Sequence, residues 1–184
     1  MARLRLIRRW SLMRNTQPEN DAEHSLQVAM IAHALAVLAR DRYGRPVDPE
    51  HVVTLAVYHD AAEVLTGDLP TPVKYHSEHL REAYAAVENA ATDRLERMLP
   101  DALRGAIAPC LSERGTEAMR LVKAADRISA YVHCLEEQRA GNREFDAAAE
   151  RILASIRGLD LPEVRDFMDE CVPAFTLTLD ELNR

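Results

Sequence analysis

Apolar residues recur along this chain with the spacing of helices. In residues 21–42 they fall three and four positions apart, at Leu26, Ala29, Met30, Ala34, Val37 and Leu38. The same pattern predicts further helices at 49 to about 65, 77–99, 100–112, 115–140, 144–157 and 160–171, and the tail TLTLDEL can start a short closing helix. No run of alternating Val, Ile and Thr indicates a sheet. We therefore predict an all-α array of about six to eight helices.

Polar and turn-forming residues mark where these helices begin and end. Asn20 can cap the first helix, with Glu23 completing a capping box. The Tyr-Gly-Arg-Pro run at 43–46 ends that helix, and Pro49 opens the next one. Two prolines in the segment 67–72 (Gly-Asp-Leu-Pro-Thr-Pro) restrict φ, so we expect a stiff loop there.

Composition narrows the class of protein. A chain of 184 residues without internal repeats or a linker fits one domain, 1–184. The formal net charge of −7 argues against bulk binding to nucleic acid or a membrane surface. No uninterrupted apolar stretch reaches the ~18 residues of a membrane span, and no apolar region follows the basic residues 1–10 as in a signal peptide. Three cysteines without C-x-x-C spacing favour a reduced, cytoplasmic setting: Cys110, Cys134 and Cys171.

The candidate chemistry centres on the adjacent pair His59 and Asp60, with His24 upstream and Asp126 downstream, all on helical patterns. Two imidazoles and two carboxylates suit a hard-to-borderline divalent ion with positions left open for water and substrate. The alternative is a solvated helix face with a core histidine. The apolar residues around the pair disfavour it, because burying charged groups without a metal or partners is costly. The pattern therefore predicts metal-assisted hydrolysis.

Glu63 adds a possible acid or base to this set. On a continuous helix it would lie on the same side as both, four residues after His59 and three after Asp60. A carboxylate there can orient or deprotonate the attacking water without binding the ion.

The remaining histidines are expected to play no part at the ion. His33 lies on the opposite side of its helix from His24, and His133 lies about 10.5 Å along the axis from Asp126. Three others lie in polar surroundings typical of the surface: His51, His76 and His79.

Several longer motifs resemble a known family. These are RWSLMRN at 9–15, EHSLQVA at 23–29, YHD at 58–60, EVLTGDLPTPVKY at 63–75, LVK at 121–123, AD at 125–126, CLEE at 134–137 and GN at 141–142. In this order they resemble the HD-domain superfamily of metal-dependent phosphohydrolases, and within it the YfbR-type bacterial 5′-deoxynucleotidases. The HD pair alone is a weak signal, whereas HDAAEVLTGDLPTPVK is specific, and the resemblance covers nearly the whole chain.

The resemblance implies a helical HD domain, usually a homodimer, that removes phosphate from deoxynucleoside 5′-monophosphates with one divalent ion. Carried over by position, the metal ligands are His24, His59, Asp60 and Asp126. Glu63 falls at the catalytic carboxylate, Arg9 at the residue that orients the phosphate, and Trp10 and Asp68 at positions that contact the sugar. The ion itself is left open among Mn, Co, Fe, Ni, Zn and Mg.

Two positions depart from the family pattern. Ser11 stands where a proline is expected beside Trp10, and residues 113–116 form a shorter segment than the pattern has. We expect that segment to border the nucleoside, which leaves the base preference open.

Physical chemistry agrees with the implied roles. The planar Arg9 cation can offset charge on phosphate oxygens, and Lys74 can help to hold phosphate unless it is simply solvated. Trp10 can supply a flat wall near the sugar, and Asp68 can accept a hydrogen bond from it.

Two other functions stay open. One is a different HD enzyme, a dNTP triphosphohydrolase or a cyclic-nucleotide phosphodiesterase. Longer phosphate chains would want more basic residues than Arg9, Arg14 and Lys74. The other is a non-catalytic metal-binding helical module, against which Glu63 argues. The many apolar positions of 77–112 further suggest a two-fold dimer.

Overall fold

The computed structural model describes residues 1–74 and 76–183, and within these ranges the chain is helical. The α-helices are α1 (Asp21–Asp41), α2 (Pro49–Tyr58), α3 (Glu63–Thr66), α4 (Thr71–Lys74), α5 (Glu78–Arg97), α6 (Asp101–Ser112), α7 (Glu117–Arg139), α8 (Asp146–Arg157), α9 (Pro162–Glu170) and α10 (Leu179–Leu182). Three short 3₁₀ helices accompany them at Leu4–Leu6, Arg143–Phe145 and Val172–Thr176. The described residues form no strand, which confirms the all-α prediction.

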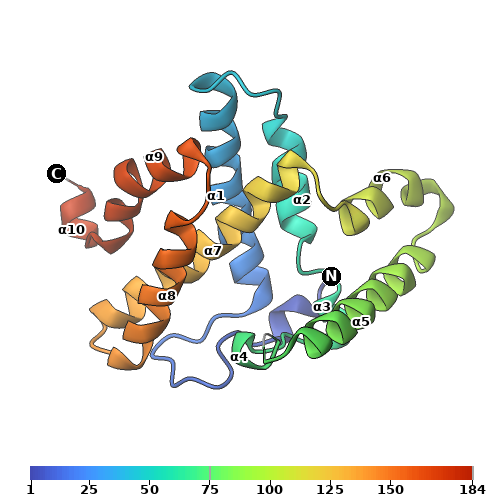
Figure 1. The fold of residues 1–184 in the computed structure, drawn as a ribbon, viewed down its shortest axis with the longest axis horizontal. Coiled ribbons are helices and arrows are strands. Elements are labelled where there is room, and N and C mark those ends of the chain that lie inside the picture. Colours follow the sequence, from blue (N-terminus) through green and yellow to red (C-terminus); the bar gives the residue numbers. More distant parts are fainter. Residues whose placement is uncertain (75, 184) are drawn as a thin grey trace.

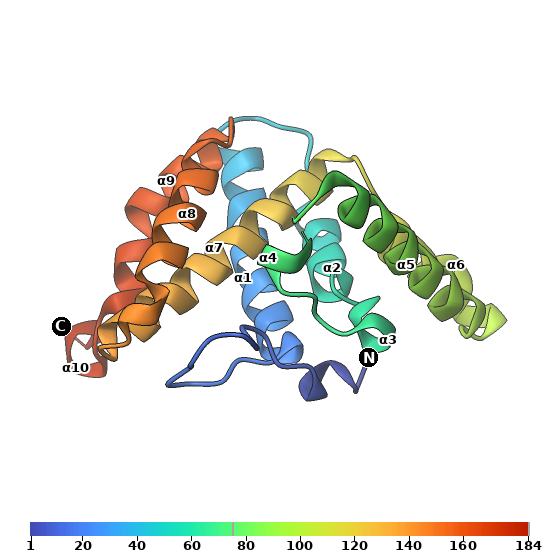
Figure 2. The same ribbon diagram turned by 60° about the horizontal axis from the view of Figure 1, so that its bottom comes forward.

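Helix α1 is the centre of the array. It crosses α7 in the middle of the molecule, with α8 and α9 on one side and α5 and α6 on the other (Figures 1 and 2). Fully buried apolar residues of α1, α2 and α7 form the main core, among them Leu35, Leu55 and Ile128. The predicted capping box is present, since Asn20 accepts hydrogen bonds from the first turn and Glu23 bonds back to the Asn20 backbone.

Helix α1 is long and apolar enough to cross a membrane by length and composition alone. The sequence did not indicate such a segment, because no uninterrupted apolar stretch in it is long enough. Half of the apolar window of α1 is buried inside the protein, as in the core helix of a helical array.

The prediction of one helix from Pro49 to about Leu65 is wrong. Helix α2 ends at Tyr58, and a tight turn leads into the short helix α3. In this turn the amide of Ala61 bonds to the carbonyl of Tyr58 and that of Glu63 to Asp60, both at 3.0 Å, which are bonds to the third preceding residue. The apolar spacing fits both a continuous and an interrupted helix, so the pattern could not distinguish them. The loop expected at 67–72 is present, but its end forms α4.

The segment before α1 folds back against the array. A single antiparallel bridge joins Arg8 to Asn20. Farther along, the buried Glu137 carboxylate of α7 accepts hydrogen bonds from the backbone amides of Thr16 and Gln17 and from the side chain of Asn142. These contacts hold residues 7–17 over the N-terminal end of α1.

Candidate metal centre and nucleotide pocket

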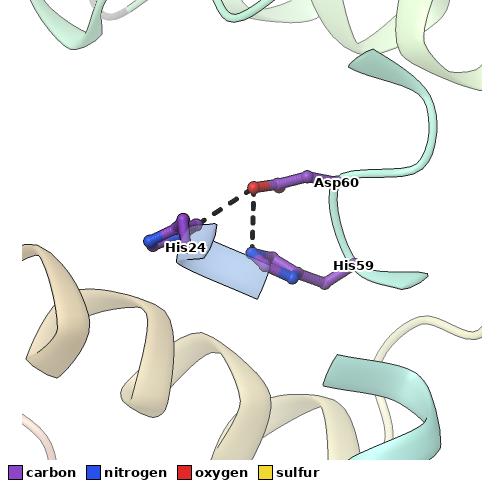
Figure 3. A group of neighbouring side chains, drawn as sticks. All are labelled: His24, His59 and Asp60. Carbon is purple, nitrogen blue, oxygen red and sulfur yellow. Dashed lines mark ion pairs between the residues drawn. The ribbon is translucent and has the colours of Figure 1, made fainter. Parts of the chain in front are cut away.

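Three elements bring the predicted ligands together. His24 comes from the first turn of α1, His59 and Asp60 from the turn after α2, and Asp126 from α7. His24, His59 and Asp60 offer ligand atoms that all lie within 4.8 Å of one another. Figure 3 shows these three side chains pointing toward a common point. Asp126 completes the set from the other side, with its Oδ1 at 3.0 Å from Nε2 of His24.

Hydrogen bonds behind the two histidines determine which ring nitrogen faces this point. Nδ1 of His59 lies 2.7 Å from the carbonyl oxygen of Ala56 and therefore carries the proton. Ser129 donates its hydroxyl proton to Gln27 at 2.6 Å, so its oxygen accepts from Nδ1 of His24 at 3.2 Å. Each histidine thus has its Nδ1 engaged and turns its Nε2 toward the cluster, the arrangement that metal-ligating histidines normally have.

The cluster fits a divalent cation. Nε2 of His59 and Oδ2 of Asp60 lie 3.0 Å apart, both buried and without a hydrogen-bond partner among the described residues. Two facing lone pairs repel unless a proton or a cation lies between them. Accordingly, although burial opposes protonation, the Asp60 carboxylate raises the pKa of His59 to about 9. A metal ion would satisfy both atoms, and the donor set of two nitrogens and two oxygens suits several divalent ions.

Arg9 lies beside this cluster. Its terminal nitrogens are 3.5 Å from Oδ2 of Asp60 and 4.0 Å from Oδ1 of Asp126. The Asp126 side chain is 41% exposed, whereas that of Arg9 is 14% exposed, so the cluster is open on the Asp126 side. An anion entering there would meet both the ligands and the guanidinium.

Glu63 lies in an acidic, buried part of the site. One of its oxygens is buried without a hydrogen-bond partner among the described residues. Burial raises the pKa of Glu63 to about 10, and nearby carboxylates, first that of Asp60, add to this effect. A protonated Glu63 can give a proton to a leaving alkoxide.

Three of the predicted substrate residues line an adjoining cavity of about 740 Å³. Arg9, Trp10, Asp68 and Asp126 line it. The remaining lining comes from the segment after Trp10, the loop before α4, and α7 and α8: Ser11, Leu12, Met13, Pro70, Thr71, Pro72, Arg127, Ala130, Ala148, Arg151, Ile152 and Ser155. A cavity with one charged end and largely apolar walls suits a nucleoside phosphate.

Two parts of the chain that were expected near the substrate are not among the described residues that line this cavity. One is Lys74, whose ammonium pairs with Glu88 of α5 at 2.8 Å and whose role toward phosphate stays a prediction. The other is the segment 113–116, in which Glu113 pairs with His51 of α2 at 2.9 Å.

The sequence did not reveal several residues of the site. Asp21 is fully buried, with neither carboxylate oxygen hydrogen-bonded among the described residues, and lies 4.0 Å from the Arg9 guanidinium. Glu19 contacts Arg9 and Trp10, and His133 stacks on the indole ring of Trp10. Only their closeness to the N-cap of α1 could have drawn attention to Glu19 and Asp21. Nothing in the spacing pointed to the contact between His133 and Trp10.

Comparisons with known proteins agree with this geometry. A family model described as "5′-deoxynucleotidase YfbR-like" matches residues 1–175. The 5′-deoxynucleotidase YfbR of Escherichia coli is 48% identical over 186 aligned positions, which cover all of this chain and 94% of that protein.

Solved structures share the fold. An HD-domain phosphohydrolase from Listeria innocua superposes with a TM-score of 0.83 at 26% identity, covering 99% of this chain and 89% of that one. The cyanophage S-2L HD phosphohydrolase, solved with dA and one catalytic Zn²⁺, has a TM-score of 0.68 at 21% identity and covers 96% and 95%; at this identity the likeness is one of fold. This chain therefore belongs to the YfbR-like 5′-deoxynucleotidase family of HD-domain phosphohydrolases.

Proposed function

We propose that this protein is a metal-dependent 5′-deoxynucleotidase that hydrolyses deoxyribonucleoside 5′-monophosphates to deoxynucleosides and phosphate. Its family and its E. coli relative, a 5′-deoxynucleotidase, support this. The observation that carries the proposal is the convergence of His24, His59, Asp60 and Asp126 beside the Arg9 guanidinium, at one end of a nucleotide-sized cavity.

In this proposal, His24, His59, Asp60 and Asp126 hold one divalent ion. When bound, the ion supplies Lewis-acid polarisation of the phosphoryl group and a lowered pKa for a coordinated water. Its identity is open among Mn, Co, Fe, Ni, Zn and Mg, although one fold neighbour contains a catalytic Zn²⁺.

The protein's own side chains orient the phosphate and transfer protons. Arg9, a planar and permanently charged group, orients the phosphate and offsets charge on its oxygens in the transition state. Burial keeps the pKa of Glu63 high, so that Glu63 can give a proton to the leaving 5′-oxygen. A nearby cation would lower the pKa of Glu63, and the carboxylate could then take a proton from the attacking water instead.

Trp10 and Asp68 face the sugar in this proposal. Both line the cavity beside Arg9. A deoxyribose packed against the Trp10 ring leaves little room for a 2′-hydroxyl, and the Asp68 carboxylate can accept a hydrogen bond from the sugar. Lys74 is the weakest of the predicted substrate residues, since Glu88 already pairs with its ammonium.

One observation favours testing a different HD activity as well. Arg127 and Arg151 also line the cavity, which adds two cations to those that the sequence indicated. A dNTP triphosphohydrolase or a cyclic-nucleotide phosphodiesterase could use them on a longer or cyclic phosphate.

Phosphate release from a panel of dNMPs, NMPs, dNTPs and cyclic nucleotides tests the proposal. We expect dNMPs to be hydrolysed, chelation to abolish turnover and an added divalent ion to restore it. Preferred turnover of dNTPs or cyclic nucleotides would assign another HD activity. No turnover in the metal-loaded protein would leave a metal-binding module, and full activity after metal removal would refute the metal-dependent mechanism.

We also propose a homodimer in a cytoplasmic setting. The arm formed by α5 and α6 carries large exposed apolar side chains, among them Val87, Met98 and Leu103. An interface between two copies would cover such residues. The three cysteines are unpaired, in keeping with a reducing compartment.

A further inference from the structure

The carboxylate of Glu19 lies where three functional side chains meet. Its Oε2 accepts hydrogen bonds from Nε of Arg9 at 3.2 Å and from Nε1 of Trp10 at 3.1 Å. Its Oε1 lies 3.6 Å from Nδ1 of His24. The Glu19 side chain is 10% exposed and is not among the described residues that line the cavity. One carboxylate behind the pocket therefore joins the residues proposed for phosphate, sugar and metal.

The backbone around Trp10 makes this double contact possible. In an extended chain, consecutive side chains such as those of Arg9 and Trp10 point to opposite sides. Here Trp10 has a φ of 55°, in the left-handed region that bulky residues seldom adopt. This conformation lets the two consecutive side chains reach the same oxygen, while the amide of Arg9 bonds to the carbonyl of Glu19 at 3.1 Å.

Other contacts hold the indole ring against this carboxylate. His133 stacks on it, with ring centroids 5.5 Å apart and planes 13° apart, and Phe145 meets it edge-on at 5.3 Å. The ring therefore has one stacked aromatic neighbour, a second in a T-shaped contact, and a charged acceptor at its N–H. Such a ring can act as a fixed wall only while all three contacts persist.

Glu19 also determines how Arg9 is oriented. A guanidinium is rigid and planar, so fixing Nε fixes the direction of the two terminal nitrogens. With Nε bonded to Glu19, those nitrogens face Asp60 at 3.5 Å and Asp126 at 4.0 Å.

We propose that Glu19 is a positioning residue that holds Arg9 and Trp10 as one unit, so that phosphate orientation and sugar discrimination depend on each other. This inference rests on the proposed deoxynucleotidase function. It assigns Glu19 no contact with substrate.

Glu19→Gln tests the inference. The amide has the same size but carries no charge, and it turns one acceptor oxygen into a donor. We expect kcat/KM for dAMP to fall about 100-fold, the scale of a misplaced binding group. The ratio of kcat/KM for dAMP over AMP should fall toward one, with bound metal unchanged. If Glu19 had a merely structural role, the substitution would lower kcat/KM for dAMP and for AMP by the same factor, and the ratio of the two would not change.

Two further variants sharpen this test. Glu19→Asp keeps the charge with a shorter reach, so we expect a ratio between those of the wild type and Glu19→Gln. Glu150→Gln, at an exposed position of α8, is the matched control and should leave both the rates and the ratio unchanged.

Fluorescence gives a readout that does not depend on turnover. Trp10 is the single tryptophan of the chain, so all tryptophan emission comes from this ring. In Glu19→Gln the indole N–H loses its charged acceptor, and we expect emission at longer wavelength as water replaces it. Glu150→Gln should emit like the wild type.

The possible outcomes separate the two proposals. If the wild type does not hydrolyse dAMP, the proposed function fails, and unchanged Trp10 emission in Glu19→Gln would overturn the positioning role as well. If the wild type is active and Glu19→Gln keeps its rate and sugar ratio, the positioning role alone is overturned. If Glu19→Gln does not fold with its ion, the test passes to Glu19→Asp. An unchanged ratio of kcat/KM for dAMP over AMP in that variant would also refute the positioning role.

Discussion

The Nε2 atoms of two histidines face carboxylate oxygens at two points of the site. His59 meets Asp60, and His24 meets Asp126, each at 3.0 Å. Their Nδ1 atoms already donate to Ala56 and Ser129, so these contacts are favourable only with a shared proton or a cation. This electrostatic situation is the residue-scale reason to expect a bound metal ion.

Substitutions at this scale should separate ligands from the acid–base group. We expect Asp60→Ala and Asp126→Ala to lose both bound metal and phosphate release. Glu63→Gln should keep the metal and lose roughly 100-fold in kcat, because it removes only an acid or base. Elemental analysis and phosphate release measure the two effects.

The exposed Asp169 and Glu150 supply controls, as Asp169→Ala and Glu150→Gln should behave like the wild type. A Glu63→Gln enzyme with nearly full kcat would show that Glu63 has another role.

Sugar discrimination also belongs to single residues. A hydroxyl pressed against Trp10, or buried without a partner, costs roughly 1–3 kcal/mol, which corresponds to about 10- to 150-fold in preference. We therefore expect dAMP to be hydrolysed well ahead of AMP, with weak dependence on the base. Asp68→Ala or Trp10→Ala should narrow that gap or abolish activity while the metal stays bound.

Kinetics on the two nucleotides measure this preference, with Asp160→Ala, at an exposed loop position, as the control. Equal kcat/KM for dAMP and AMP in the wild type would refute the deoxynucleotide assignment but leave the phosphatase assignment standing.

At the scale of elements, one buried carboxylate ties the N-terminal segment to α7. Glu137 is 1% exposed and accepts hydrogen bonds from the Thr16 and Gln17 amides, the Thr16 hydroxyl and Asn142. Although burial opposes it, these hydrogen bonds lower the pKa of Glu137 to about 2, from 4.5. The segment that carries Arg9 and Trp10 depends on this contact.

This contact predicts a particular pH dependence of stability. The Glu137 pKa is lower in the folded state, so its contribution is complete above about pH 4.5 and is lost as the pH falls toward 2. It amounts to at most about 3 kcal/mol. Glu137→Gln should therefore lower the free energy of unfolding at neutral pH by about 2 kcal/mol and flatten its decline between pH 4.5 and 2.

Urea unfolding at several pH values measures this change. Glu150→Gln, at an exposed position of α8 far along the chain from Glu137, is the control and should leave the curve unchanged. An equal loss in both variants would show that the Glu137 hydrogen bonds contribute little.

At the scale of the whole molecule, the arm of α5 and α6 stands apart from the core that surrounds α1 (Figures 1 and 2). We expect light scattering at micromolar concentration to give twice the chain mass of 20.7 kDa. Replacing Met98 and Leu103 with Lys should shift the protein toward the monomer if the arm is the interface. A wild-type species of single-chain mass would contradict the dimer.

Much of the architecture follows from local patterns. The apolar period and the Asn20–Glu23 capping box predicted α1 closely, and the helices near 77–99, 100–112 and 115–140 were found within a few residues. Helix periodicity and capping involve residues within a turn or two of one another, so a sequence can display them directly. The motifs likewise pointed to His24, His59, Asp60 and Asp126, and the structure brings these side chains together.

The tertiary structure decided what depends on contacts between distant segments. The turn that breaks α2 at His59, the pairing of Lys74 with Glu88, and the burial of Asp21 and Glu19 behind Arg9 leave no periodic trace in the chain. Each arises because packing selects among local conformations of similar energy and because electrostatic partners meet only after folding. The sequence by itself thus determined the fold class, the family and the metal-binding residue types. Only the folded chain decided which nitrogen of each histidine faces the cluster, which cations line the cavity and which carboxylate bonds to both Arg9 and Trp10.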